Sequence, residues 1–157
     1  MGDYMSDYIK EIRKKIGHDR LIMVGAGIFL YKDGKVLLQK RRDNNRWALH
    51  GGCVEVGEIV EEAAKRELFE ETGLTANNIE LLGVFSGEDR LFTYSNGDEV
   101  YMIGIVYVCN DFSGELRPEA NEVHELKWFD IDNLPEEINP PNRKPLEHFV
   151  EYISRTK

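Results

Sequence analysis

The sequence predicts a single α/β domain in which a mixed β-sheet lies between helices. Three observations lead to this fold class: apolar runs separated by turn-forming dipeptides, a helical repeat of apolar residues near each end, and an acidic segment with helical spacing between the strands. At 157 residues the chain has the length of one domain, which buries roughly two-thirds of its unfolded surface. We expect a helical extension over residues 1–17 and one domain over residues 18–157.

The N-terminal segment is expected to form a helix that ends before Gly17. Its apolar residues recur at helical spacing, and they are Met5, Tyr8, Ile9, Ile12 and Ile16. Two strands should follow over residues 21–31 and 36–40, because the dipeptide Asp33-Gly34 between them is a strong hairpin signal.

A second hairpin is expected across Asn96-Gly97, between residues 92–95 and 99–108. Because residues 99–108 are apolar at nearly every position, we expect this strand to be buried on both faces. The remaining elements should be strands over residues 79–85 and 125–129 and a last helix opened by Pro145, with Leu146, Phe149, Val150 and Ile153 on one face.

The charge balance argues against a grip on nucleic acid. The net charge is −9 and the pI is near 5.0, whereas nonspecific binding of nucleic acid needs a basic surface. No membrane span is expected, because the longest apolar-leaning run, residues 21–31, is too short to cross a bilayer. The N-terminus lacks the apolar core of a signal peptide, and Cys53 and Cys109 are expected to be free thiols. We therefore expect a cytoplasmic protein.

Residues 52–74 carry a cluster of carboxylates with helical spacing. Glu67, Glu70 and Glu71 lie at positions i, i+3 and i+4, so on a helix they share one face. Repulsion between like charges at these spacings costs roughly 0.2–0.5 kcal/mol per pair, so a cation should offset it. Ala63 and Ala64 precede Glu67 by four and three residues, which places the acids on the inward face of the helix. This arrangement indicates a site for divalent metal ions that bind a diphosphate.

The same segment matches a known signature, G-x5-E-x7-R-E-U-x-E-E-x-G-U, in which U is aliphatic. Every fixed position is filled, by Gly52, Glu58, Arg66, Glu67, Leu68, Glu70, Glu71, Gly73 and Leu74. Residues 47–52 resemble the W-x-L-P-G-G lead-in to that signature, with His50 where proline is usual. The chain therefore resembles the Nudix hydrolase family of MutT type, and the resemblance implies an α/β/α sandwich with a mixed sheet. We expect the loop at His50 to keep the family conformation, so that His50→Pro would be neutral or mildly stabilising.

The resemblance also implies roles for the residues of the signature. Arg66 would orient Glu67, and Glu58 would tie the loop to the helix. Carboxylates suit the chemistry because hard oxygen ligands bind Mg²⁺ while leaving coordination places for water and phosphate. The implied ligands of Mg²⁺, or of Mn²⁺ in its place, are Glu67, Glu70, Glu71 and the backbone carbonyl of Gly51.

The general base stays open at this point. Members of the family use either a glutamate of the signature or a carboxylate from a later loop. We favour Glu67, with Glu122 as an additional ligand or an alternative base, and Glu119 and Glu125 are the neighbouring candidates. His124 is expected to be a strand-edge residue, because the metal and the carboxylates already account for the proton transfer.

Substrate recognition leaves weaker marks in the sequence. Candidates for stacking on a base are Trp47, Phe85, Phe92 and Tyr94, although aromatic residues at strand positions belong to the core more often. No proline follows the signature closely, where many ADP-ribose pyrophosphatases have one, and Tyr94 lies beyond the tyrosine position of many dinucleoside-polyphosphate hydrolases. Candidates to bind a terminal phosphate come from the dense basic cluster Lys40, Arg41, Arg42 and Arg46, for each of which a solvated loop charge is the alternative.

These features together predict an Mg²⁺-dependent pyrophosphohydrolase that cleaves a nucleoside diphosphate linked to another group. A MutT-like hydrolase of nucleoside triphosphates is the favoured reading. An ADP-ribose or nucleotide-sugar pyrophosphatase is the alternative among enzymes, and a Nudix ligand sensor without turnover is the alternative outside them. The expected partner is a small nucleotide, with no nucleic acid and no membrane, and the sequence leaves open whether the chain forms a homodimer.

Overall fold

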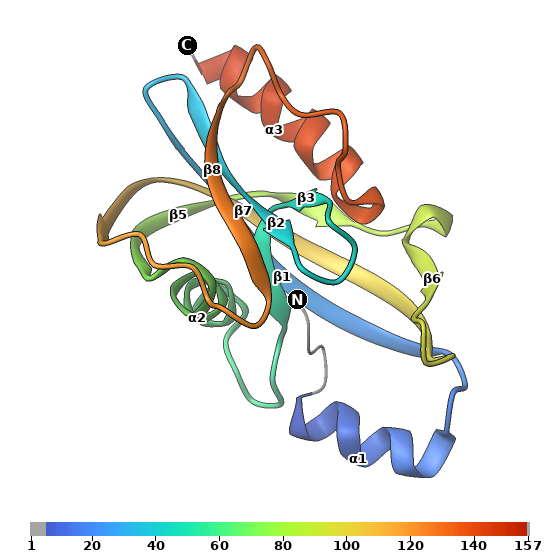
Figure 1. Cartoon of the computed structure of the whole chain (residues 1–157). Helices are drawn as coiled ribbons and strands as arrows, with labels where there is room; N and C mark the ends of the chain where they lie inside the picture. The colour runs from blue at the N-terminus through green and yellow to red at the C-terminus, as the bar shows by residue number, and fades with distance from the viewer. Residues whose placement is uncertain (1–5, 157) are drawn as a thin grey trace.

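The computed structural model describes residues 6–156 and shows a twisted mixed sheet with helices on both faces (Figure 1). Two long strands, β1 (Leu21–Lys32) and β7 (Glu99–Gly114), run parallel at its centre. All other strand pairs are antiparallel. β1 also pairs with β2 (Lys35–Arg41) and β4 (His50–Cys53), β2 pairs with β3 (Trp47–Ala48) and β8 (Val123–Asp130), and β7 pairs with β5 (Leu74–Phe85) and β6 (Leu91–Thr93).

Both predicted hairpins are present, because their turn residues adopt the conformations that such turns require. Asp33 and Gly34 have φ values of 54° and 76°, the left-handed pair that matches the twist of the flanking strands. They join β1 to β2 in the register that pairs Lys32 with Lys35. Gly97 has a φ of 95° in the second hairpin, which joins β6 to β7.

One helix covers each face of the sheet. Alternate residues of a strand point to opposite faces, so β1 contributes Ile28 to one core and Phe29 to the other. Helix α2 (Val60–Thr72) packs its buried Leu68 on the first face. Helix α3 (Arg143–Thr156) packs Phe149 on the second face, where its ring lies 4.9 Å from the ring of Phe29. This is the α/β/α sandwich that the sequence predicted.

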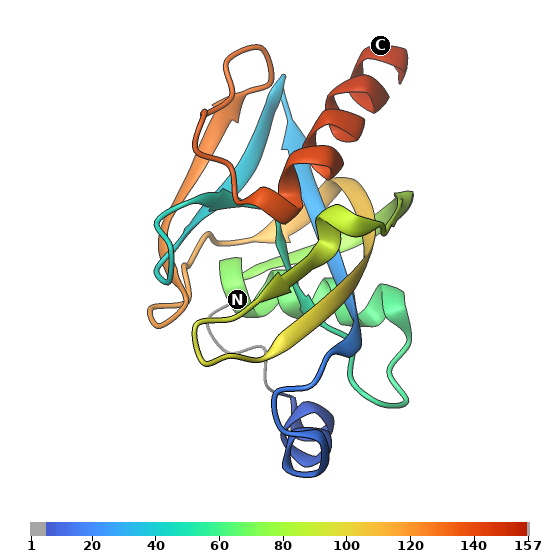
Figure 2. The same cartoon turned by 90° about the vertical axis from the view of Figure 1, so that its right-hand side faces the viewer.

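The N-terminal helix α1 (Asp7–Ile16) lies against the end of the sheet, below the β6–β7 hairpin (Figure 2). Ser6 caps it by accepting a hydrogen bond from the backbone N–H of Ile9. Its Arg13 is buried, forms an ion pair with Asp98 of the hairpin and donates to the backbone carbonyl of Glu99 at 2.9 Å. The predicted helix is therefore present from Asp7 onward, while Met5 lies outside the described residues.

Several expected boundaries were wrong. Residues 47–53, expected as a loop into the signature, form β3 and β4, and β5 begins at Leu74 rather than at residue 79. β7 continues to Gly114, and one of its faces is only half-buried at Ile103 and Ile105. Helix α3 begins at Arg143, two residues before Pro145, after a 3₁₀ turn over Pro140–Asn142. Within residues 6–156 no helix is both long enough and apolar enough to span a membrane.

Candidate active site

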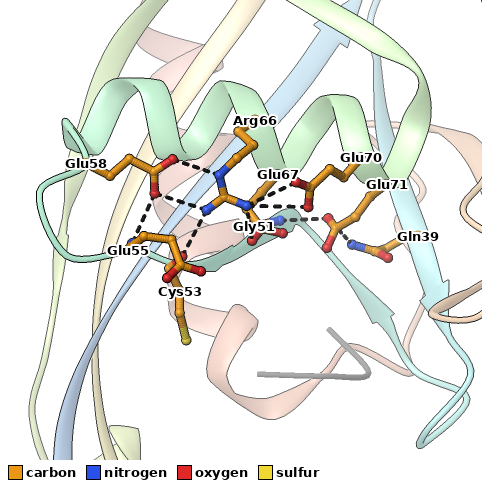
Figure 3. Close-up of polar contacts among 9 residues, drawn as sticks. All are labelled: Gln39, Gly51, Cys53, Glu55, Glu58, Arg66, Glu67, Glu70 and Glu71. Carbon is orange, nitrogen blue, oxygen red and sulfur yellow. Dashed lines mark hydrogen bonds and ion pairs between the residues drawn. The ribbon is translucent and has the colours of Figure 1, made fainter. Parts of the chain in front are cut away.

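Arg66 on α2 holds the acidic segment together (Figure 3). Its Nε and Nη2 donate to the two carboxylate oxygens of Glu58 at 2.7 and 3.0 Å, a bidentate pair. Its Nη1 donates to Glu67 at 3.0 Å and to Glu70 at 3.2 Å, and Nη2 also reaches the carbonyl oxygen of Cys53. One guanidinium therefore joins the loop before α2, the end of β4 and two turns of the helix.

Glu58 closes the loop that leads into α2. One of its carboxylate oxygens accepts the backbone N–H of Glu55 at 3.0 Å in addition to its two bonds from Arg66. Hydrogen bonding by Arg66 holds the pKa of Glu58 below its usual range, so this carboxylate is ionised at neutral pH. The contact between loop and helix that the resemblance implies is thus made by this pair.

Glu71 is buried beneath the same loop, at 1% exposure. Its Oε1 accepts the backbone N–H of Gly51 at 2.9 Å and the side-chain amide of Gln39 at 2.9 Å. Its Oε2 has no hydrogen-bond partner among residues 6–156. Burial raises the pKa of Glu71 to about 8, with a further contribution from Glu67, because a carboxylate charge is costly away from water.

Glu67 lies between these groups and is largely buried. Burial raises its pKa to about 7, against the opposing effect of Arg66, and the charges of Glu70 and Glu122 add to the rise. Gly52 leaves the space that its carboxyl group fills, since a Cβ at that position would lie 2.4 Å from the carboxyl carbon of Glu67. A glycine is therefore required at this position of the signature.

The predicted metal ligands do not form a ready-made cation cluster. Among residues 6–156 no three acidic, histidine or cysteine side chains gather closely enough to hold a metal ion. Glu67 and Glu70 are bonded to Arg66 instead, while Glu71 faces Gly51. The donor set nevertheless suits Mg²⁺, because its atoms are hard oxygens and one buried oxygen of Glu71 has no partner. Burial raises the pKa values of Glu67 and Glu71, so a cation beside them would lower the cost of ionising both.

A later loop lies along the end of α2. The backbone N–H of Glu119 donates to the carbonyl of Glu71 at 3.2 Å, and the side chain of Glu119 accepts the backbone N–H of Glu122 at 2.9 Å. Glu122 is therefore near enough for its charge to raise the pKa of Glu67. Glu125 and His124 are exposed on β8, where Glu125 is paired with Lys40. Of the loop acids proposed as a base, the structure brings Glu122 to Glu67.

A pocket adjoins the acidic loop, with Gly51 and Gly52 in its lining. Its lining includes Gly25, Gly27 and Gly104 of the central strands, together with Phe92 and Tyr94, whose rings meet edge to face at 5.3 Å. Polar groups that the sequence reasoning missed complete the lining: Gln39, Arg90, Asn139 and Asn142. For Gln39 a signal existed, because it is a polar residue inside an otherwise apolar strand.

The predicted substrate residues fall into different places. Arg41 lines the pocket and donates to Asp43 at 2.8 Å, whereas Arg42 donates to the carbonyl of Ala120 outside the pocket lining. Arg46 is half-buried outside that lining. Trp47 is buried in the core with its ring edge against Phe129 at 4.7 Å. Of the four basic candidates, Arg41 alone lines the pocket, and of the aromatic candidates Phe92 and Tyr94 line it.

His50 is a core residue in β4 rather than part of a loop. Its imidazole is fully buried, and Nε2 lies 3.1 Å from the carbonyl oxygen of Leu37. Burial lowers the pKa of His50 to about 4, so the ring is neutral at physiological pH. His50 is absent from the pocket lining. It stands where the family usually has proline, and its side chain packs beside Leu37 of β2.

Comparisons with known proteins agree with this geometry. A family described as NUDIX domain matches residues 21–149. The chain is 43% identical over 136 residues to an ADP-ribose pyrophosphatase of Methanocaldococcus jannaschii, covering 82% of this chain and 76% of that protein. It is 34% identical over 126 residues to nucleoside triphosphatase NudI of Escherichia coli, covering 74% and 89%. The crystal structure of a MutT NUDIX hydrolase from Burkholderia pseudomallei superposes with a TM-score of 0.71 at 33% identity, covering 82% and 98%.

Proposed function

The chain belongs to the Nudix family and is a nucleotide pyrophosphohydrolase, and on this premise we propose that it is an Mg²⁺-dependent hydrolase of nucleoside triphosphates. The observation that carries the proposal is the placement of Glu58, Glu67 and Glu70 around Arg66 directly beside one pocket. The expected products are a nucleoside monophosphate and pyrophosphate. Hydrolysis of this bond requires neutralised phosphate charge, an activated water and alignment of both.

The residues that would hold Mg²⁺ are Glu67, Glu70, Glu71 and the carbonyl of Gly51. When bound, Mg²⁺ supplies neutralisation of phosphate charge and activation of water. Arg66 fixes the orientation of Glu67, since its Nη1 donates to that carboxylate while Glu58 holds its other two nitrogens. Gln39 and the backbone N–H of Gly51 fix Glu71 in the same way. These contacts set the orientation of Glu67 and Glu71 on α2.

Glu67 is the proposed general base. A base must be held in a fixed orientation, and Arg66 holds the carboxylate of Glu67 while Gly52 leaves the space that it fills. Glu122 is the alternative, because its loop lies along the end of α2 and its charge is felt at Glu67. Replacement by glutamine distinguishes the two, since loss of the base lowers kcat far more than it raises KM.

The choice of triphosphates rests on Arg41. It lines the same pocket as Gly51 and Gly52, which lie against Glu71 and Glu67, so it is placed to receive a terminal phosphate. ADP-ribose is the second candidate, because the relative with 43% identity bears the name ADP-ribose pyrophosphatase. Arg41 is engaged with Asp43, so a phosphate would have to share or replace that contact.

A substrate panel tests the proposal. Nucleoside triphosphates, ADP-ribose, nucleotide sugars and dinucleoside polyphosphates are incubated with Mg²⁺ or Mn²⁺, and the products are separated by chromatography. We expect triphosphates to give the highest kcat/KM and to yield monophosphate plus pyrophosphate. A clear preference for ADP-ribose would replace the substrate while leaving the metal-assisted mechanism in place. Absence of hydrolysis across the panel would favour a ligand sensor instead.

A further inference from the structure

The pocket contains a buried cation whose charge no contacting carboxylate balances. Arg90 belongs to the short 3₁₀ helix Glu88–Arg90 and is 6% exposed. Among residues 6–156 no carboxylate forms an ion pair with its guanidinium, and burial lowers the pKa of Arg90, as expected for a desolvated cation. Arginine is seldom buried without such a partner, so its remaining donors call for an acceptor.

Two of the three guanidinium nitrogens bind backbone. Nε donates to the carbonyl of Met102 at 3.1 Å, and Nη1 donates to the carbonyl of Pro141. These bonds fix the guanidinium between β7 and the segment before α3. Nη2 has no hydrogen-bond partner among residues 6–156 and occupies the space over Gly104, 2.5 Å from where a Cβ would lie. Because Arg90 and Gly104 both line the pocket, Nη2 is presented to its interior.

The rest of the pocket suits a flat ring with polar edges. Phe92 and Tyr94 supply aromatic rings, Leu49 and Met102 lie over Gly27 and Gly25 and add apolar surface, and Arg90 adds a polar group to the same lining. A nucleobase has this combination of an apolar face and an edge of hydrogen-bonding atoms.

The pocket lies at a suitable distance from the acids. Gly104 pairs with Gly25 across β7 and β1, and Gly25 pairs with Cys53 across β1 and β4. Two strand spacings separate Gly104 from Cys53, roughly 10 Å. Glu67 packs on Gly52, the residue before Cys53. A nucleotide whose phosphates lie at the acids therefore extends far enough to bring its base to Arg90.

We propose that Arg90 is a specificity-determining residue whose Nη2 donates to an exocyclic carbonyl oxygen of the bound nucleobase. This inference rests on the proposed function only in taking the ligand to be a nucleotide. A 6-oxopurine offers a carbonyl oxygen next to the ring acceptor N7, the edge that arginine binds best, whereas adenine has an amino donor at C6. A donor buried against a donor leaves both unpaired, so adenine nucleotides bind about tenfold more weakly than 6-oxopurine nucleotides.

Binding of inosine and adenosine monophosphate tests the inference, because the two ligands differ at the purine C6–N1 edge. Calorimetric titrations are made with Mg²⁺ present, since the acidic site repels a phosphate group without cations, on the wild type, Arg90→Met and Gly104→Ala. Gly104 is outside the left-handed region, and its added Cβ would meet only the flexible end of Arg90, so this variant displaces Nη2 while keeping the arginine. We expect a preference of about tenfold for inosine monophosphate in the wild type and near-equal affinities in both variants. Arg143→Met, an exposed arginine outside the pocket lining, should behave as the wild type.

Circular dichroism shows whether each variant is folded. If Arg90→Met does not fold, the comparison of Gly104→Ala with the wild type tests the inference by itself. Equal affinities in the wild type, no measurable binding of either ligand at millimolar concentration, or an unchanged preference in the folded variants would overturn the inference. Hydrolysis of the two triphosphates is followed separately. If the protein prefers inosine monophosphate through Arg90 but hydrolyses neither triphosphate, the proposed function is wrong and the role of Arg90 stands. If it hydrolyses them and its base preference does not depend on Arg90, the proposed function stands and the role of Arg90 is wrong.

Discussion

At the residue scale, several carboxylates of the site share one arginine, Arg66. Arg66 is shared by Glu58, Glu67 and Glu70, whereas among residues 6–156 no cation forms an ion pair with Glu71, whose Oε2 has no hydrogen-bond partner. Like charges at helical spacing repel each other, and burial adds to the cost of ionising them. In the metal-free protein this cost raises the pKa values of Glu67 and Glu71, so that both carboxyl groups hold their protons to a higher pH.

Glu71→Gln should separate catalysis from folding. We expect turnover with Mg²⁺ to fall ~10-fold or more, because a buried carboxylate donor is lost. The melting temperature of the metal-free protein should rise by a few degrees, since glutamine still accepts the N–H groups of Gly51 and Gln39 without a buried charge. Glu62→Gln, at an exposed position of the same helix, is the matched control and should change neither quantity. Full turnover of Glu71→Gln would remove Glu71 from the metal site.

Stability should also depend on pH in a definite direction. The folded pKa values of Glu71 and Glu67, about 8 and about 7, exceed the ordinary value of 4.5, so the folded protein binds more protons in that range. The stability that comes from these bound protons is lost as the pH rises through the two folded pKa values. The pKa of His50 is shifted in the opposite direction, to about 4, so His50 changes the stability with pH only below its ordinary pKa of 6.5. Between pH 6.5 and 8 the melting temperature of the metal-free protein should fall as pH rises.

Thermal unfolding in a chelator, followed at several pH values, measures this slope. Glu71→Gln provides the control, because it removes the group with the higher pKa and should flatten the curve. Equal slopes for the wild type and this variant would mean that Glu71 is ionised normally in the folded protein.

At the scale of elements, the sequence predicted what local chemistry determines. Asp33-Gly34 and Asn96-Gly97 select their turns almost regardless of context, so both hairpins are where they were expected. The inward stripe of α2 likewise follows from the spacing of Ala63 and Ala64, both fully buried. Gly73 ends this helix in the left-handed conformation that glycine adopts readily.

Features that depend on distant partners could not be predicted in this way. β4 is a strand because His50 and its neighbours pair with residues of β1 that lie 22 to 28 positions earlier, and not because of its own composition. The pocket position of Arg90 depends on the carbonyls of Met102 and Pro141 and on the space above Gly104. Trp47 was expected near the substrate, yet pairing of β3 with β2 directs it into the core against Phe129.

The change from loop to strand reverses the expected effect of His50→Pro. Proline removes a backbone N–H from β4 and leaves unfilled the space that the buried imidazole occupies beside Leu37. We now expect destabilisation of about 2–4 kcal/mol, measured by denaturant unfolding, with kcat of the folded fraction near that of the wild type. His50→Gln keeps the backbone N–H and a side-chain donor, so it should lose less. Collapse of activity without loss of stability would show instead that His50 acts on the substrate or the metal.

At the scale of the whole molecule, function depends on a strong local charge imbalance. The net charge is −9, and residues 55–71 hold seven acids against Lys65 and Arg66, a net of −5. The acids lie beside the pocket, because α2 contacts β4 at Gly51 and Gly52. A polyphosphate is repelled from such a site unless cations bind first. The arrangement of charges therefore supports the proposed dependence on a metal ion.

Metal-dependent turnover is accordingly the most direct test. The wild-type protein, stripped of metal, is incubated with a nucleoside triphosphate while Mg²⁺ is titrated, and release of monophosphate and pyrophosphate is followed by chromatography. We predict that turnover rises with Mg²⁺ to saturation and disappears when excess EDTA is added. Undiminished turnover in excess EDTA would contradict the assignment of Glu67, Glu70 and Glu71 as ligands of a catalytic cation.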